Sequence, residues 1–467
     1  MVSAAEQLAS NLNLGAFAKA EDLKNRLWFT LGALLVYRFG TFIPIPGVNA
    51  AAFAEAFKSQ SSGFLGMFNM FAGGAVERLA IFTLNIMPYI SASIIMQLMS
   101  SLSPKLEALK KEGEAGRKQI NQYTRYLTVV LATFQAYGIA IGLESSHSGV
   151  GAVIMDPGWF FRLTTVVTLV GGTLFLMWLG EQITQRGVGN GISLIIFAGI
   201  VAGLPRALSG LFEMARINTI STGLLFALLA LMLFVIAAIV FIERAQRRLL
   251  IQYPKRQMGN RMFQGDASHL PLKLNSSGVI PPIFASSLLV LPLTIAQFTA
   301  GSGPTWVSRV FPEAITRYLP EWGDIAAALG RGQPLYLSIY VALIIFFAFF
   351  YTAVVFNPKD TAENLRKYGG FLPGIRPGDK TAEFIDYVLT RITVIGAIYL
   401  AMVCVLPEFL ISYAAVPFYF GGTSLLIAVS VTMDTVAQIQ SHLLAHQYEG
   451  LIKKAKLRGA SSNKGRR

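Results

Sequence analysis

Long apolar runs separated by shorter polar segments recur along the whole chain. We expect ten membrane spans, at residues 26–46, 76–100, 122–143, 159–180, 188–206, 221–242, 276–298, 335–356, 385–406 and 417–446. At a rise of ~1.5 Å per residue, about 20 residues cross a hydrocarbon core of ~30 Å. The pattern therefore predicts an all-α integral membrane protein.

A shorter apolar segment lies between the first two spans. It comprises Gly63, Phe64, Leu65, Gly66, Met67, Phe68, Asn69, Met70, Phe71, Ala72, Gly73 and Gly74. A helix over 64–71 would reach only about 12 Å, too short to cross a bilayer. At membrane depth a half-helix is stable only where protein buries it or where it lines a water-filled cavity. We therefore interpret 63–74 as a re-entrant helix beside a pathway.

Composition agrees with a membrane protein. Hydrophobic residues make up 54% of the 467 residues and charged residues only 14%, against about 25% charged residues in soluble domains. The single cysteine, Cys404, excludes an intramolecular disulfide and a cysteine-based metal cluster. The net charge of +14 could indicate nucleic-acid binding or a positive-inside bias, so the positions of the charges must decide.

The basic residues are concentrated in alternate connections. The loops after spans two, six and eight and the tail after span ten are rich in Lys and Arg, whereas residues 145–158 and 407–417 contain neither. The positive-inside rule therefore predicts that both termini are cytoplasmic. Five spans in each half would give two inverted halves with a pathway between them.

This reading divides the chain into four parts. We expect a cytoplasmic segment at 1–25, an N-terminal half at 26–206, a C-terminal half at 207–446 and a basic cytoplasmic tail at 447–467. The re-entrant segment 63–74 belongs to the first half. Two long cytoplasmic loops, 243–275 and 357–384, belong to the second.

The sequence offers no catalytic constellation. It contains no GxxxxGK[ST] phosphate loop, and His442 and His446 lack both the glutamate of HExxH and a third ligand nearby. We therefore expect no enzyme activity, no cofactor and no metal. Ionisable residues in the spans are few: Asp434 is expected inside span ten, and Arg38 is expected to reach the outer interface.

The two long cytoplasmic loops carry the candidate binding residues. Arg247, Arg248, Lys255 and Arg256 alternate with apolar residues in the first loop, and Arg376 stands between Pro-Gly pairs in the second. Proline and glycine fix tight turns, so Arg376 is expected at a rigid loop tip. Such residues could contact an acidic protein surface or ribosomal RNA, or could be positive-inside charge with no partner.

Several long strings resemble one known family. They are FGTFIPIPG from Phe39, MFNMFAGGAVERLAIFTLNIMPYISASIIMQ from Met67, KKEGEAGRKQINQYTRY, ERAQRRLLIQYPKRQ, HLPLKLNSSGVIPPIFASS, GIRPG and VPFYFGGTSLLIAV. In this order they resemble the SecY family, the large channel subunits of the bacterial Sec protein-conducting translocon. The resemblance runs from the first span to the C-terminal tail.

The resemblance implies a pore and assigns its parts. Two five-helix halves would enclose an hourglass pore, and 63–74 would be the plug that closes it from outside. Seven isoleucines would form the apolar pore ring: Ile86, Ile90, Ile192, Ile196, Ile280, Ile283 and Ile427. A lateral gate between spans two and three and spans seven and eight would include Ser91, Gln135 and Ser287.

The resemblance also implies partners. SecE would clamp the halves, SecG would be peripheral, and either the SecA ATPase or a translating ribosome would dock on the basic loops. The substrates would be preproteins with their signal peptides, and transmembrane segments would leave into membrane lipid. We therefore expect a protein-conducting channel of the bacterial inner membrane. The alternatives are an inverted-repeat transporter for small solutes and a static scaffold.

Overall fold

The computed structural model describes residues 21–49, 52–55, 57, 69, 72–145, 147–148, 151–152, 154, 156–217, 221–253, 256–258, 261–263, 267–289, 334–414 and 422–464. Helices dominate these residues. In chain order they are α3 (Glu21–Gly40), α6 (Met87–Leu102), α7 (Pro104–Lys111), α8 (Glu114–Ser145), α9 (Trp159–Arg186), α10 (Gly191–Arg216), α11 (Thr222–Arg244), the short helix Ile280–Leu289, α16 (Pro334–Val355), α17 (Pro358–Lys367), α18 (Asp379–Ala414) and α19 (Gly422–Lys464).

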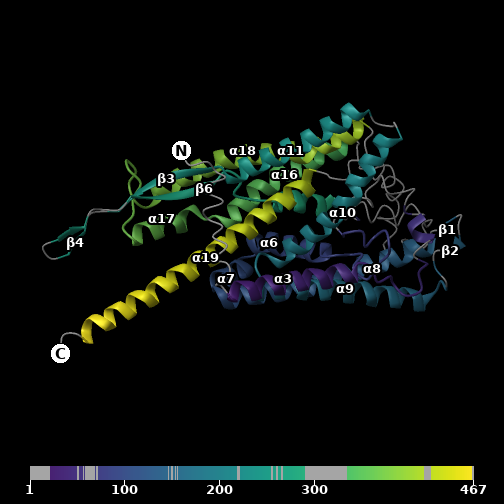
Figure 1. Cartoon of the computed structure of the whole chain (residues 1–467), viewed down its shortest axis with the longest axis horizontal. Helices are drawn as coiled ribbons and strands as arrows, with labels where there is room; N and C mark the ends of the chain where they lie inside the picture. Colours follow the sequence, from purple (N-terminus) through teal and green to yellow (C-terminus); the bar gives the residue numbers. More distant parts are fainter. Residues whose placement is uncertain are drawn as a thin grey trace.

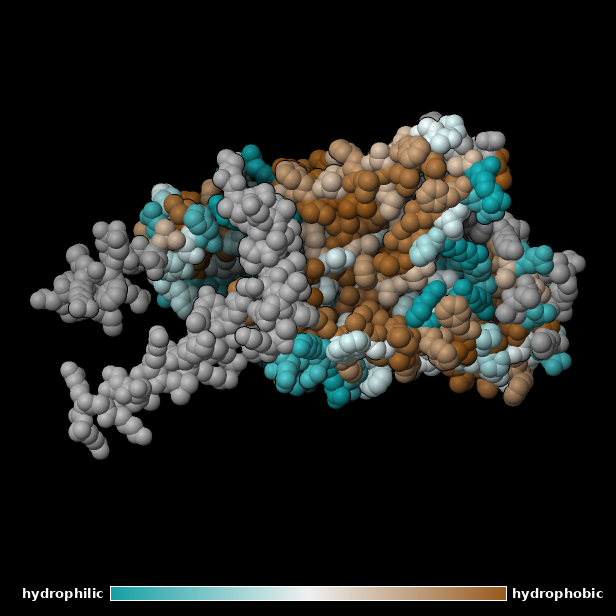
Figure 2. All heavy atoms as spheres, in the orientation of Figure 1, coloured by the Kyte–Doolittle hydropathy of each residue, from teal (hydrophilic) through white to brown (hydrophobic). Residues whose placement is uncertain are grey.

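The all-helical membrane architecture expected from the sequence is confirmed. Six of the described helices are long and apolar enough to span a bilayer, namely α9, α10, α11, α16, α18 and α19. At the positions of the other four expected spans lie α3, α6, α8 and the helix Ile280–Leu289. In Figure 2 apolar residues gather across the middle of the face shown, between more polar ends. A belt of this kind matches an apolar solvent around the helices.

The helices pack in two groups joined by shared contacts. α8 packs against α6 and α9, while α16 and α19 both pack against α18. α10 contacts α9 and also α19, so it connects the two groups. Figure 1 shows α3, α8 and α9 on one side of the molecule and α11, α16 and α18 on the other.

Polar connections gather at the two ends of the bundle. Two antiparallel pairs, β3 (Gln246–Gln252) with β6 (Ala267–Lys273) and β4 (Arg256–Met258) with β5 (Arg261–Phe263), extend from one end. Figure 1 shows α7, α17 and the C-terminal part of α19 at that same end, and the small pair β1 (His147–Ser148) with β2 (Gly151–Ala152) at the opposite end. The basic loops therefore share one end, and the loop without Lys or Arg lies at the other.

The expected start of the second span at residue 76 is wrong. Residues 72–86 form turns, and α6 begins only at Met87, with proline in its first turn. Leu79 and Asn85 have φ of 44° and 48°, a left-handed conformation that an α-helix cannot contain. The backbone N–H of Ile45 bonds to the carbonyl of Leu79 (2.8 Å) instead, so these turns pair with the segment that follows α3.

Asp434 lies in α19, inside the apolar stretch Gly422–Ala445 that is long enough to span a membrane, as expected. Its side chain is 70% exposed, and its carboxylate lies 3.9 Å from the ammonium of Lys273, at the end of β6. Its charge is thus paired with a lysine of the β3–β6 pair.

Candidate pore constriction, seam and basic loops

The seven candidate ring isoleucines come together in one apolar cluster. Ile86, Ile90, Ile196 and Ile427 are buried, with exposed fractions of 1%, 7%, 6% and 1%. Ile192, Ile280 and Ile283 are partly buried and pack against the same cluster. Residues from four distant parts of the sequence therefore belong to the same apolar core.

Local sequence explains how α10 presents its two isoleucines. The Asn190 side chain accepts a hydrogen bond from the backbone N–H of Ile192 at 3.1 Å and so caps the helix. Gly191 follows because a Cβ there would lie 1.9 Å from the carbonyl oxygen of Gly180, so only glycine fits. Ile192 and Ile196 are then one turn apart on the same face.

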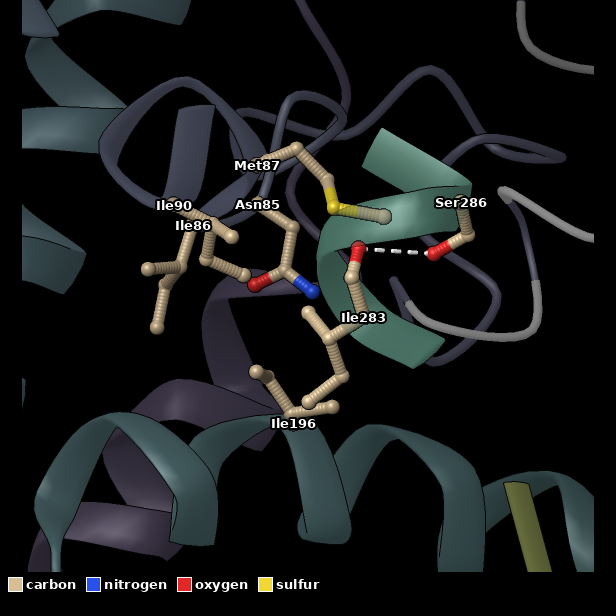
Figure 3. A pocket seen from close by; sticks show the side chains of 7 residues that line it. All are labelled: Asn85, Ile86, Met87, Ile90, Ile196, Ile283 and Ser286. Carbon is tan, nitrogen blue, oxygen red and sulfur yellow. Dashed lines mark hydrogen bonds between the residues drawn. The ribbon is translucent and has the colours of Figure 1, made fainter. Parts of the chain in front are cut away.

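A small cavity lies at the centre of this cluster. Four of the candidate ring residues line it, Ile86, Ile90, Ile196 and Ile283, together with Asn85, Met87 and Ser286. In Figure 3 Ile196 of α10 and Ile283 of the short helix point toward each other, with Ile86 and Ile90 on a neighbouring wall. Most of the lining is apolar; of its two polar side chains, Ser286 donates its hydroxyl to the carbonyl of Ile283 at 2.9 Å, and Asn85 adds an amide.

Sequence reasoning missed three of the lining residues. Asn85 and Met87 flank Ile86 in the string LNIMPYI, and Ser286 follows Ile283 by three residues. The available signal was a lone asparagine inside an apolar run, directly before a candidate ring residue. An amide there is a polar group at the edge of the constriction.

One of the candidate lateral-gate residues, Ser287, lies at the seam where the helix Ile280–Leu289 contacts α6. The hydroxyl of Ser287, which is 3% exposed, donates to the sulfur of Met87 at 3.8 Å. Ser91 is buried one turn further along α6. Gln135 is half-buried on α8, which packs against α6. Hydrogen bonds to thioether sulfur are weak, so this seam is held mainly by apolar contact.

Most of the candidate plug lies outside the described residues; Asn69, Ala72, Gly73 and Gly74 lie within them. These four are well fixed. A guanidinium nitrogen of Arg38 donates to the Gly73 carbonyl at 2.6 Å, and the Glu77 backbone N–H donates to the Asn69 side chain at 2.9 Å. Arg38 therefore fastens the end of this segment to α3 and does not simply reach toward the interface.

A close approach and an ion pair add to this attachment. Gly73 has φ +65°, and a Cβ there would lie 3.0 Å from the Cα of Gly199 on α10. Glu77 accepts two bonds from Arg206 of α10, at 2.7 and 3.0 Å. The C-terminal end of the segment 63–74 is thus tied to both α3 and α10.

The two basic loops form one folded platform. The backbone groups of Gln252 and Phe371 exchange two hydrogen bonds, of 2.9 and 3.0 Å, which join the first loop to the second. Beneath them Leu249, Leu272 and Leu372 pack with the start of α18 in one apolar cluster. The loops therefore present their charges on a fixed surface.

The candidate docking arginines project from this platform. Arg247 and Arg248 on β3 and Arg376 in the second loop are exposed. The Arg376 turn is bounded by Gly374 and Gly378, whose φ values are +80° and +108°; such values suit glycine. Its carbonyl accepts a bond from the Thr381 hydroxyl at 3.0 Å. Lys255 and the side chain of Arg256 lie outside the described residues.

A bundle of apolar helices that encloses an apolar constriction and carries a basic platform at one end defines a multi-span membrane channel. Comparison with known proteins identifies the family. The SecY family model matches residues 80–436. The protein translocase subunit SecY of Rickettsia conorii is 54% identical over 437 residues, which cover 94% of this chain and 97% of that protein. The chain therefore belongs to the SecY family.

Other relatives agree. The protein translocase subunit SecY of Escherichia coli (strain K12) is 52% identical over 439 residues, which cover 94% of this chain and 96% of that protein. A solved SecY structure concerned with how its plug domain stabilises the closed channel has a TM-score of 0.62 at 18% identity, covering 89% of this chain and 92% of that one. Sec61 in a canine ribosome–channel complex has a TM-score of 0.57 at 16% identity, covering 89% and 92%. These two likenesses show the fold, and the transporter alternative gains no support.

Proposed function

We propose that this chain is the central protein-conducting channel subunit of a Sec translocon. It passes unfolded preproteins across the bacterial inner membrane and releases transmembrane segments sideways into lipid. The observation that carries the proposal is that four of the seven candidate isoleucines, Ile86, Ile90, Ile196 and Ile283, line one small apolar cavity. Family membership supports the same function.

An apolar ring suits a substrate whose side chains change at every step. A polar or charged site would bind some residues strongly and stall them, whereas an aliphatic collar offers none a strong partner. An apolar constriction also empties of water when no chain occupies it, which blocks ions. The segment 63–74 would add a second barrier as the plug, and its attachment through Arg38 and Glu77 supports that role.

Lateral release requires a seam that can part. We assign this role to α6 and the helix Ile280–Leu289, named the gate helix from here on, with Ser91, Gln135 and Ser287 as its polar residues. The weak contact between Ser287 and Met87 supports this assignment. A transmembrane segment would leave through the seam because lipid accepts an apolar helix whose backbone bonds are satisfied internally.

The driving energy is assigned to partners. The sequence holds no phosphate-binding loop, so ATP or GTP hydrolysis would belong to the SecA ATPase or to a translating ribosome. Both would dock on the platform of Arg247, Arg248, Lys255, Arg256 and Arg376. SecE would clamp the halves 26–206 and 207–446 together, and SecG would sit at the periphery.

Reconstitution tests the proposed function. The chain is purified with its small subunits, placed in proteoliposomes, and supplied with ATP, SecA and an unfolded preprotein. We expect the preprotein to become protected from added protease, and a radiolabelled amino acid or sugar to remain outside. Uptake of the small solute without protection of the preprotein would support the transporter and exclude the channel.

A further inference from the structure

The residues just before the gate helix are clamped from several sides. Asn275 is 3% exposed, and its side-chain NH₂ donates to the Glu243 carboxylate of α11 at 2.7 Å and to the Gly278 carbonyl at 3.1 Å. Its amide oxygen accepts a bond from the Ser277 hydroxyl at 3.1 Å. One buried side chain thus links the end of α11 to the entry of the gate helix.

The backbone of the same segment is fixed on two further sides. The N–H of Leu274 donates to the carbonyl of Ala245 at 2.9 Å, which extends the β3–β6 ladder by one residue pair. On the other side lies Gly396 of α18, where a Cβ would come within 2.8 Å of the Leu274 carbonyl oxygen. Leu274 is therefore packed between the end of α11 and α18.

Beyond this clamp the chain bends at a glycine. Gly278 has φ +62°, and a Cβ there would meet no atom within 4 Å. Glycine is therefore needed for its backbone conformation and not for space. The gate helix starts two residues later, and Ser287, about two turns along it, meets α6 through a 3.8 Å contact with Met87. The helix is held at its root by several hydrogen bonds, and at the seam by apolar packing and one weak hydrogen bond.

We propose that residues 274–278 are the fixed pivot of the gate helix, with Glu243 and Asn275 as positioning residues. On this proposal the seam opens by rotation of the helix about Gly278, while its root stays against α11 and α18. The inference rests on the proposed function, because it requires that the gate helix moves. Beyond that function, the inference specifies which end of the gate helix moves and which residues hold its other end in place.

Two cross-links separate the pivot from the gate. In a Cys404→Ser background, the pair Ala245→Cys and Leu274→Cys locks the root. Directly opposed residues of an antiparallel ladder have Cα atoms about 4.5–5.5 Å apart, within the range of a disulfide. A second pair, Met87→Cys and Ser287→Cys, locks the seam through a short bifunctional thiol reagent.

The expected outcomes are opposite. The root lock should leave preprotein transport in proteoliposomes at the level of its reduced form, and the seam lock should abolish transport until the cross-link is cleaved. If both the root lock and the seam lock abolish transport, the root must move as well. This result would overturn the proposed pivot but would still agree with a lateral gate at the seam. Full transport with the seam locked would overturn the gate itself, and the pivot with it.

A substitution series tests the positioning residues. Glu243→Leu leaves the Asn275 amide without its acceptor, whereas Glu243→Gln can still accept that bond through its amide oxygen. With the root loosened, the cysteine at position 287 is no longer held against the cysteine at position 87, so the rate of seam cross-linking in the resting channel should fall roughly tenfold in Glu243→Leu. Glu243→Gln should retain the original rate.

Gly278→Ala keeps the pivot testable if Glu243→Leu fails to fold. Alanine adds no clash there but disfavours the left-handed backbone, so it should also slow seam cross-linking. Equal rates in Glu243→Leu, Gly278→Ala and the parent channel, with normal membrane insertion, would overturn the proposed pivot.

Discussion

Isoleucine at the constriction must seal a pore and still let chains pass. Ile86 and Ile427 are each 1% exposed, so both candidate ring residues are packed as in a core. The collar gives no polar partner to a passing chain, yet aliphatic side chains can shift between rotamers. The seal should therefore depend on side-chain volume at the cavity.

Removing volume at the cavity tests this. Ile196→Gly should raise the resting ion conductance of the channel in planar bilayers several-fold, because Ile196 lines the cavity and faces Ile283. Ile200→Gly is the matched control: it lies one turn further on α10 and is fully buried, but does not line the cavity. Both changes place glycine in the same helix, so both carry the same loss of helix propensity, about 1 kcal/mol relative to Ala. Equal leakage from both would mean that the constriction lies elsewhere.

Arg38 supports the seal from a second position. Its bond to the Gly73 carbonyl is charge-assisted, and such bonds contribute about 1.5–3 kcal/mol. Arg38→Met keeps much of the side-chain length and removes the donor. We expect brief openings of the resting channel in bilayer recordings to become several-fold more frequent.

The control for Arg38 lies on α9. Arg162→Met removes a guanidinium paired with Glu144 that has no described bond to the segment 63–74. It should leave the opening frequency unchanged. An unchanged frequency in Arg38→Met would show that the anchor does not hold the closed state.

Among the elements, hydropathy located most helices but could not locate breaks that depend on the backbone. The run over 76–100 is apolar throughout, yet α6 starts only at Met87 because Leu79 and Asn85 adopt left-handed conformations. The turn at Leu79 pairs with residues 43–45, which are distant in sequence, through the bonds Ile45 N–H to Leu79 and Ile81 N–H to Ile43. A local apolarity pattern contains no information on such pairing.

The site shows the same division. The isoleucines of α6 and α10 recur at helical spacing, but nothing in their pattern distinguishes them from the other buried isoleucines of the same helices. Family resemblance selected them, and the fold brings them together. The hydrogen bond from the buried Asn275 amide to Glu243 joins residues 32 apart in sequence, and no sequence motif predicts it.

The platform allows a specific docking prediction, because it carries Arg376 on a rigid turn beside other exposed basic residues. Arg376→Glu should strongly reduce SecA-driven preprotein transport while membrane insertion of the channel stays normal, because the side chain is exposed on a rigid turn. Arg366→Glu makes the same charge change on an exposed residue of α17 in the same loop. Transport lost equally in both would indicate a general electrostatic effect. Normal transport in Arg376→Glu would exclude the assigned contact.

At the scale of the whole molecule, orientation follows from where the charges lie. The basic loops and α7 share one end of the bundle, and the loop around β1 and β2, which carries no Lys or Arg, occupies the other. The positive-inside rule then predicts that the platform is cytoplasmic. Since docking partners and exported chains lie on opposite sides of the membrane, the proposed function requires this orientation.

Thiol labelling in intact cells checks the orientation. In a Cys404→Ser background, Asp156→Cys places a thiol on an exposed residue beside β2, and Arg248→Cys places one on an exposed residue of β3. A membrane-impermeant maleimide, small enough to cross the outer membrane, should label Asp156→Cys in intact cells and Arg248→Cys only after the inner membrane is opened. The parent chain is the blank, because Cys404 is 3% exposed. The reverse order of labelling would show that the channel has the opposite orientation, with the platform outside. It would then exclude cytoplasmic motors as partners of the platform.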